Sequence, residues 1–285
     1  MTQRDWGLIT ILSILWGGSF FFVEVALTAL PALSIVWLRV ALAAAILGVV
    51  IKVRGLAFPP RTVWGAMAVM GLLNNAVPFT LIAVAQGQIS GGVASILNAT
   101  TPLFTVVVAH LATHDERITR AKLLGLALGF AGVAMMMAGA EWGGAYAAKI
   151  MCLLAALSYA CAGVWGRRFR RLGVAPLTTA FGQVTASALI LLPVMVLVDR
   201  PWALDWPGGQ VALAVVGIAA LSTALAYLIY FRVLATAGAT NLMIVTFLIP
   251  VSAVALGVLI LDEALLPQHL AGFALIALGM VAIEG

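Results

Sequence analysis

Long apolar runs separated by short polar turns follow one another along the whole chain. No Asp, Glu, Lys or Arg occurs between Thr62 and Thr113, so a pair of soluble helices would lack a solvated face there. Each run approaches the roughly 20 residues that a helix needs to cross a bilayer, and the bilayer interior excludes open sheet edges. The pattern predicts ten membrane-spanning helices. They cover Trp6–Ala26, Ser34–Ile51, Thr62–Ala85, Gly91–Leu111, Leu123–Gly139, Ala147–Gly166, Pro176–Val198, Gly209–Phe231, Ala239–Leu261 and Gln268–Ile283.

The second half of the chain repeats the pattern of the first. The pair Asp115–Glu116 recurs as Asp262–Glu263 about 147 residues later. We therefore expect two units of five helices each, over residues 1–140 and 146–285. Because five is an odd number, the second unit enters the membrane upside down relative to the first. The predicted fold class is an all-α membrane protein with two inverted five-helix repeats around a central cavity, which is a transporter architecture.

Composition and charge agree with this class. The chain is 64% hydrophobic and 9% charged, with a mean hydropathy of +1.16, whereas soluble proteins carry about 25% charged residues. Most of the 15 Lys and Arg residues lie near the amino terminus or in the loops after the even-numbered spans, which predicts that both termini are cytoplasmic. The net charge of +5 has the same origin, so we expect membrane lipid as a partner and no nucleic acid.

Glu24 and Arg39 are charged residues inside predicted spans. A charge at the centre of a bilayer costs about 2.5–3.5 kcal/mol on insertion scales, so each is expected to have a partner. Both lie toward the outer ends of adjacent helices, which favours an ion pair between them. Two alternatives stay open for Glu24: a site for a proton or cation, and a position facing the outer lipid headgroups.

Three predicted helices combine a proline with polar neighbours at mid-depth. Proline removes one backbone hydrogen bond and frees the carbonyl four residues earlier, here those of Asn74, Asn98 and Thr246. Free carbonyls in a membrane are tolerated where they line a cavity, and the alternative is a packing kink satisfied by neighbouring helices. The predicted kinks are at Pro78, Pro102 and Pro250.

Polar and aromatic side chains near these kinks are candidates for binding a substrate. Aromatic rings form apolar walls with a polar handle, although rings near helix ends also serve as interface anchors. The candidate substrate-binding residues are Trp16, Ser19, Asn74, Asn75, Phe79, Asn98, Thr101, Tyr159, Tyr227 and Thr246. The three histidines form no convincing metal motif, and no nucleotide-binding loop or enzyme signature occurs. We therefore expect no metal, no cofactor and no catalytic activity.

Each half of the chain carries several short motifs. In the first half they are LWGGSF (15–20), Arg39, ISGGVASILNATTPLFT (89–105), Glu116 and GLALGFAGV (125–133). In the second half they are AGATN (237–241), Pro250, LDE (261–263) and AGFALIALGM (271–280). Together they resemble the EamA family of the drug/metabolite transporter superfamily, over essentially the whole chain as two EamA repeats. The family often has a lysine where this chain has Glu24.

The resemblance implies ten helices around a central cavity, with small metabolites moved by alternating access. The chain is most similar to the amino-acid-exporting branch. We therefore expect a secondary transporter that can act as a monomer. It is expected to export a small-molecule substrate across the bacterial inner membrane, with neutral or aromatic amino acids as the leading class. The alternative is efflux of cationic drugs with Glu24 as the essential carboxylate.

Overall fold

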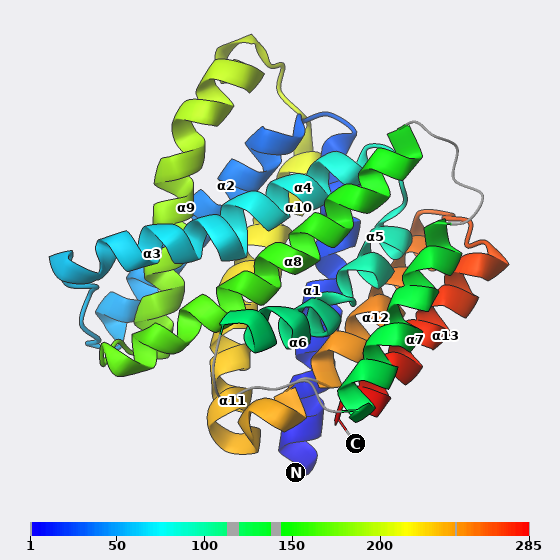
Figure 1. Ribbon diagram of the computed structural model, residues 1–285. Helices are drawn as coiled ribbons and strands as arrows, with labels where there is room; N and C mark the ends of the chain where they lie inside the picture. The colour runs from blue at the N-terminus through cyan, green and yellow to red at the C-terminus, as the bar shows by residue number, and fades with distance from the viewer. Residues whose placement is uncertain (1, 113–119, 138–143, 243, 285) are drawn as a thin grey trace.

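A computed structural model describes residues 2–112, 120–137, 144–242 and 244–284, and these contain helices and turns but no β-strand (Figure 1). The α-helices are α1 Gln3–Leu27, α2 Ala32–Val53, α3 Trp64–Gly71, α4 Val77–Gln86, α5 Gly91–Asn98, α6 Thr101–Ala112, α7 Arg120–Met137, α8 Gly144–Arg171, α9 Pro176–Asp199, α10 Gly209–Ala219, α11 Ala226–Leu242, α12 Ile244–Ile260 and α13 Pro267–Glu284. The turn at Asp115–Glu116 and the predicted repeat boundary at 140 lie outside the described residues.

Seven helical spans of the described chain are long and apolar enough to cross a membrane. They are Gln3–Leu27, Ala32–Val53, Arg61–Gln86, Gly91–Ala112, Ala145–Arg171, Pro176–Asp199 and Gly209–Ala237. Two shorter apolar helices, Lys122–Met135 and Leu248–Ile260, lie within α7 and α12. The all-α class is thus confirmed, with seven clear membrane-type helices. Figure 1 places both termini on the same side of the molecule.

Two spans are interrupted at mid-length by a π-helical turn. One turn, Leu72–Ala76, joins α3 to α4, and the other, Ala220–Leu225, joins α10 to α11. They start about 148 residues apart, which is the spacing of the repeat. A π-turn widens the helical ladder locally and is frequent at functional sites. Pro78 follows the first π-turn directly and lies in the first turn of α4, where a missing N–H is tolerated.

Equivalent helices of the two repeats pack against each other. Ser34 at the start of α2 donates its N–H and its hydroxyl to the carboxylate of Asp199, at 2.6 and 2.7 Å, at the end of α9. Further along α2, the indole N–H of Trp37 donates to the carbonyl of Ala188, at 3.1 Å. Because the residue numbers rise along one helix and fall along the other, α2 and α9 run antiparallel.

The helices α7 and α13 also pack antiparallel, side by side in Figure 1. A Cβ atom on Gly132 would lie 2.5 Å from the carbonyl oxygen of Gly272, and one on Gly279 would lie 2.5 Å from that of Gly125. Gly125 and Gly272 are equivalent in the two repeats, and so are Gly132 and Gly279. Small residues allow such close backbone approach in membranes. Antiparallel packing of equivalent helices is what an inverted repeat predicts.

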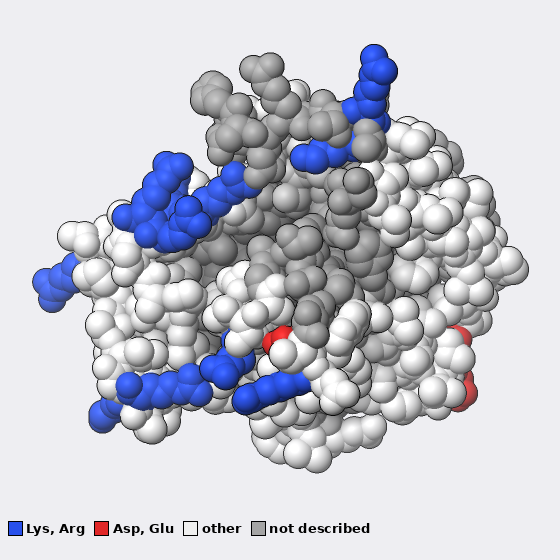
Figure 2. Space-filling model, turned by 90° about the horizontal axis from the view of Figure 1, so that it is seen from below, with Lys and Arg blue, Asp and Glu red and all other residues white. Residues whose placement is uncertain are grey.

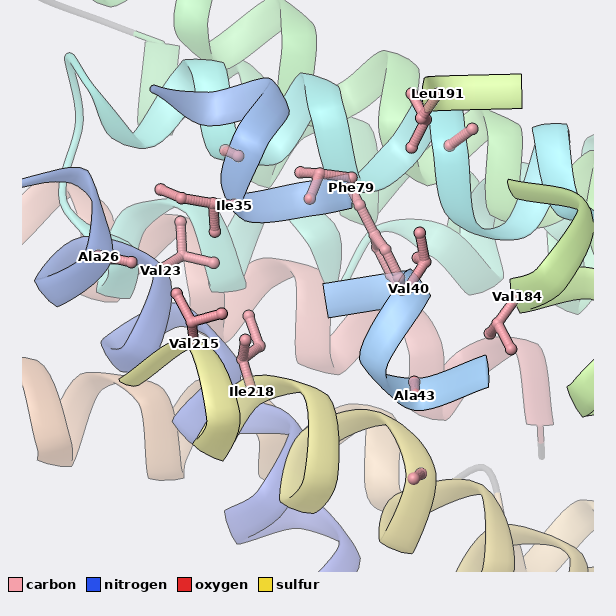
Figure 3. Packing of buried hydrophobic residues seen from close by; sticks show 14 of the residues in the cluster. Val23, Ala26, Ile35, Val40, Ala43, Phe79, Val184, Leu191, Val215 and Ile218 are labelled. Carbon is pink, nitrogen blue, oxygen red and sulfur yellow. The ribbon is translucent and has the colours of Figure 1, made fainter. Parts of the chain in front are cut away.

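The largest hydrophobic cluster combines side chains from both repeats. Val23 of α1, Val40 of α2 and Phe79 of α4 pack with Val184 of α9 and Ile218 of α10. Figure 3 shows Phe79 extending toward Val40. The core therefore lies between the repeats, and it borders the polar residues described next.

Candidate substrate site

Polar side chains of the first π-turn meet side chains of the second repeat. The residues in these contacts and in that of Arg39 with the second π-turn are called the polar cluster: Arg39, Asn74, Asn75, Gln183, Thr223 and Tyr227. The side-chain amide of Asn74 donates to the amide oxygen of Gln183 and to the hydroxyl of Tyr227, both at 3.3 Å. The amide of Asn75 donates to the same hydroxyl, at 3.1 Å. Consecutive residues of a regular α-helix do not face one partner, so the widened turn is what allows both amides to reach Tyr227.

Arg39 of α2 contacts the second π-turn and the helix α4. Its Nε–H donates to the hydroxyl of Thr223 in the second π-turn, at 2.9 Å, and its Cζ lies 3.6 Å from the centroid of the Phe79 ring. The Thr223 hydroxyl donates in turn to the carbonyl of Ile218, at 2.8 Å. The expected ion pair between Arg39 and Glu24 is therefore wrong, because the guanidinium contacts a hydroxyl and a ring.

Aromatic rings border this polar cluster on one side. The ring of Tyr159 in α8 meets that of Phe79 edge-on, with centroids 6.5 Å apart. Because Phe79 also lies under the guanidinium of Arg39, apolar surface and charge adjoin at one point. An apolar wall beside a few polar groups is typical of small-molecule sites.

A second row of rings connects α1 to the cluster. Trp16 packs against Tyr230, with centroids 5.6 Å apart, and Tyr230 meets Phe231 edge-on at 5.0 Å. Phe231 stacks on Tyr227 at 6.3 Å. Trp16 thus reaches the polar cluster through other rings.

Three members of the polar cluster are almost fully buried, whereas Asn74 and Tyr227 are half-buried. Asn75 has no exposed surface, and Gln183 and Thr223 are each 2% exposed. At the position expected for a central cavity, side chains therefore contact one another. Within the described chain, the Oδ1 atom of Asn75 and the hydroxyl of Ser222 are buried without a hydrogen-bond partner. Leaving a buried polar atom unpaired costs about 1–3 kcal/mol. Because native proteins seldom leave such atoms unpaired, these two atoms are candidates for binding a ligand.

Other expected site residues use their polar groups within their own helices. The hydroxyl of Ser19 donates to the carbonyl of Trp16, at 2.8 Å, and that of Thr101 donates to the carbonyl of Asn98, at 2.7 Å. The expectation that Pro102 leaves a bare carbonyl at Asn98 is thus wrong, since the adjacent hydroxyl satisfies it. The side-chain Oδ1 of Asn98 is itself buried without a partner in the described chain.

The polar residues of α12 lie apart from these contacts. Pro250 is buried inside the helix, and Thr246 is half-buried. No hydrogen bond among the described residues joins Thr246 to the polar cluster.

Glu24 lies in a different place, at the amino end of α5. The N–H of Gly91 donates both to the Oε2 atom of Glu24 and to the Oε1 atom of Glu263, each at 3.0 Å. The N–H of Gly92 donates to the other oxygen of Glu263, at 3.0 Å. Glu263 follows α12, so this contact holds the second repeat to α1 and α5 of the first. A carboxylate is a favourable group at a helix N-terminus.

Sequence reasoning missed two members of the cluster and misplaced a third. Gln183 is an isolated amide inside an apolar span, which could have marked it as a candidate. Thr223 is the repeat equivalent of Asn75, and aligning the repeats there would have found it. The sequence marks Arg39 as a charge inside a span, but the partner it predicts, Glu24, is not the group that Arg39 contacts.

The architecture defines the class of protein. An all-helical membrane protein of two repeats, with polar and aromatic groups between them, is typical of secondary transporters. The profile of the EamA-like transporter family matches residues 6–138 and 147–284, so the chain belongs to this family.

Related proteins agree with this assignment, and a solved structure shares the fold. The chain is 28% identical over 253 residues to the "Uncharacterized inner membrane transporter YedA" of Escherichia coli K12, covering 88% of this chain and 81% of the relative. It is 24% identical over 310 residues to a "Probable amino-acid metabolite efflux pump" of Salmonella typhimurium LT2, covering 98% and 94%. A crystal structure that is 20% identical has the same fold, with a TM-score of 0.69 over 99% of this chain and 96% of the other. The protein is a multi-pass membrane transporter of small molecules.

Proposed function

We propose that this transporter exports neutral or aromatic amino acids by alternating access, with the polar cluster as the substrate site. One observation carries the proposal: Asn74 and Asn75 of one repeat meet Tyr227 of the other at a single hydroxyl. Separation of the repeats would break these contacts and free the same amides and hydroxyl for a ligand. Polar groups of this kind suit the zwitterion, and the adjoining rings suit an apolar side chain.

We further propose that α7, α12 and α13 also cross the bilayer, which completes ten helices in two inverted repeats over residues 1–140 and 146–285. The antiparallel packing of α2 with α9 and of α7 with α13 supports the inversion. Lys and Arg side chains lie along the left and upper parts of the face seen from below in Figure 2, and the acidic surface visible there is smaller. This face supports a cytoplasmic location of both termini, in a bacterial inner membrane.

Counterflow in proteoliposomes tests the proposed function. Vesicles preloaded with unlabelled amino acid are expected to accumulate labelled neutral amino acids, phenylalanine among them, above empty vesicles. Asn75→Ala removes one hydrogen-bonding group worth about 1 kcal/mol and is expected to lower the initial rate about tenfold once the binding geometry is also lost.

Thr10→Ala is the matched control for this experiment. The Thr10 hydroxyl is exposed on α1 and donates only to the carbonyl of Trp6, at 3.0 Å, so this variant is expected to transport at the wild-type rate. Absence of counterflow with every neutral amino acid, in protein that is folded and inserted, would contradict the proposal. Equal loss of rate in both variants would show that the cluster is not the site.

A further inference from the structure

The buried guanidinium of Arg39 has no acidic partner in the described chain. Its side chain is 8% exposed, although it carries a positive charge inside a membrane-type span. Its contacts are the hydroxyl of Thr223 and the ring of Phe79, and the ring of Phe79 in turn meets that of Tyr159 edge-on. Buried charges in proteins are normally paired with an opposite charge or bound to a ligand.

The hydrogen-bonding capacity of Arg39 is mostly unused. A guanidinium presents five N–H donors, and only the one on Nε has an acceptor among the described residues. The two terminal nitrogens form the fork that matches the two oxygens of a carboxylate. Thr223 cannot supply a negative charge, because its hydroxyl accepts from Arg39 and donates to a backbone carbonyl.

The position of Arg39 is held by both repeats. Phe79 supports the face of the guanidinium from the first repeat, and Thr223 binds its Nε–H from the second. Contact with an aromatic face stabilises a cation when both are withdrawn from water. The terminal nitrogens are therefore oriented before a ligand arrives, which lowers the entropy lost on binding.

Each of the two π-turns also carries a buried oxygen atom that can accept a hydrogen bond. Asn75 Oδ1 in the first turn and the hydroxyl oxygen of Ser222 in the second are buried without a partner in the described chain. Asn75 is fully buried and Ser222 is 1% exposed. Such oxygens suit an ammonium group, which carries N–H donors and no acceptor.

We propose that Arg39 binds the carboxylate of the transported molecule and that Asn75 and Ser222 accept hydrogen bonds from its ammonium group. This inference rests on the proposed function and assigns roles within the same site. One guanidinium provides one positive charge, which suits a single carboxylate. The transporter would therefore require a carboxylate and reject the corresponding amine.

Three labelled compounds of similar size test this requirement in proteoliposomes: phenylalanine, 3-phenylpropionate and phenethylamine. The wild type is expected to transport phenylalanine and to move phenethylamine at least about tenfold more slowly, because the amine lacks the charge that Arg39 binds. Arg39→Gln is expected to lose about 10- to 100-fold of the phenylalanine rate, and Arg39→Lys to retain part of it, because lysine keeps the charge without the fork.

Arg54→Gln is the matched control, since Arg54 is exposed at the carboxyl end of the same helix. Folding of each variant is checked by thermal unfolding in detergent, which also provides a second readout. Millimolar 3-phenylpropionate is expected to raise the unfolding midpoint of the wild type and of Arg54→Gln but not that of Arg39→Gln.

Equal transport of phenethylamine and phenylalanine by the wild type, or an unchanged phenylalanine rate in Arg39→Gln, would overturn the inference and leave amino acid export standing. The reverse case is also distinguishable. A wild type that moves no amino acid but is stabilised by 3-phenylpropionate through Arg39 would overturn the proposed function and support the carboxylate site. Stabilisation that persists in Arg39→Gln would overturn the inference.

Discussion

Replacement of Gly279 by leucine is expected to lower the thermal unfolding midpoint of the purified protein by about 6–12 °C, because it forces α7 and α13 apart. A Cβ atom at this position would lie 2.5 Å from the carbonyl oxygen of Gly125 and 2.7 Å from the nitrogen of Gly129. Both neighbours are backbone atoms, so no side-chain rotation relieves the overlap. The helices would have to separate and lose the close packing that holds them together in a membrane.

The same change at Gly163 provides the control. Nothing lies within 4 Å of a Cβ atom added there, in the second half of α8, so Gly163→Leu is expected to unfold at the wild-type temperature. Gly132→Leu should behave like Gly279→Leu, since Gly132 meets the backbone of Gly272 in the same way. Equal midpoints for Gly279→Leu and Gly163→Leu would show that this contact does not limit stability.

Replacement of Glu263 by alanine is expected to release the amino end of α5 from the second repeat. The two oxygens of Glu263 accept the N–H groups of Gly91 and Gly92, and hydrogen bonds to a charged group contribute about 1.5–3 kcal/mol each. We therefore expect a lower unfolding midpoint and at least a tenfold lower counterflow rate, because one side of the transporter would no longer close firmly.

Asp262→Asn is the control for Glu263→Ala. It removes a negative charge from the same loop, and asparagine tolerates the left-handed backbone of Asp262, whose φ is 54°. Glu24→Gln is expected not to lower the midpoint, because its amide oxygen still accepts from Gly91 and no longer places a like charge beside Glu263. A midpoint equally lowered in Asp262→Asn and Glu263→Ala would contradict a specific role for Glu263 at α5.

For the two intramembrane charges, the sequence predicts the depth in the membrane but not the contact partner. Hydropathy and topology place Glu24 and Arg39 at similar depths in neighbouring helices, and that much is a property of each segment. The direction in which each side chain points depends on how the helices rotate and pack. Arg39 contacts the second π-turn and Phe79 of α4, and Glu24 contacts α5, so two charges expected to meet each contact other groups.

The π-turns are a second case. The segments Leu72–Ala76 and Ala220–Leu225 are aligned by the repeat, and the asparagines of the first were expected in the site. No local pattern predicts that the helical ladder widens there. The widening brings both amides within hydrogen-bonding distance of Tyr227, and this contact exists only when the two repeats are packed together.

The sequence by itself determined the class of this protein: an all-α membrane protein of two repeats, with Asn74, Asn75 and Tyr227 among its polar centre. These features follow from hydropathy, length and internal repetition, which are read along the chain. The tertiary structure alone decided that Arg39 joins this centre, that Gln183 and Thr223 complete it, and that Glu263 binds α5. The physical reason is that hydrophobic burial along a helix sets its place in the bilayer, whereas partners between helices are set by packing across them.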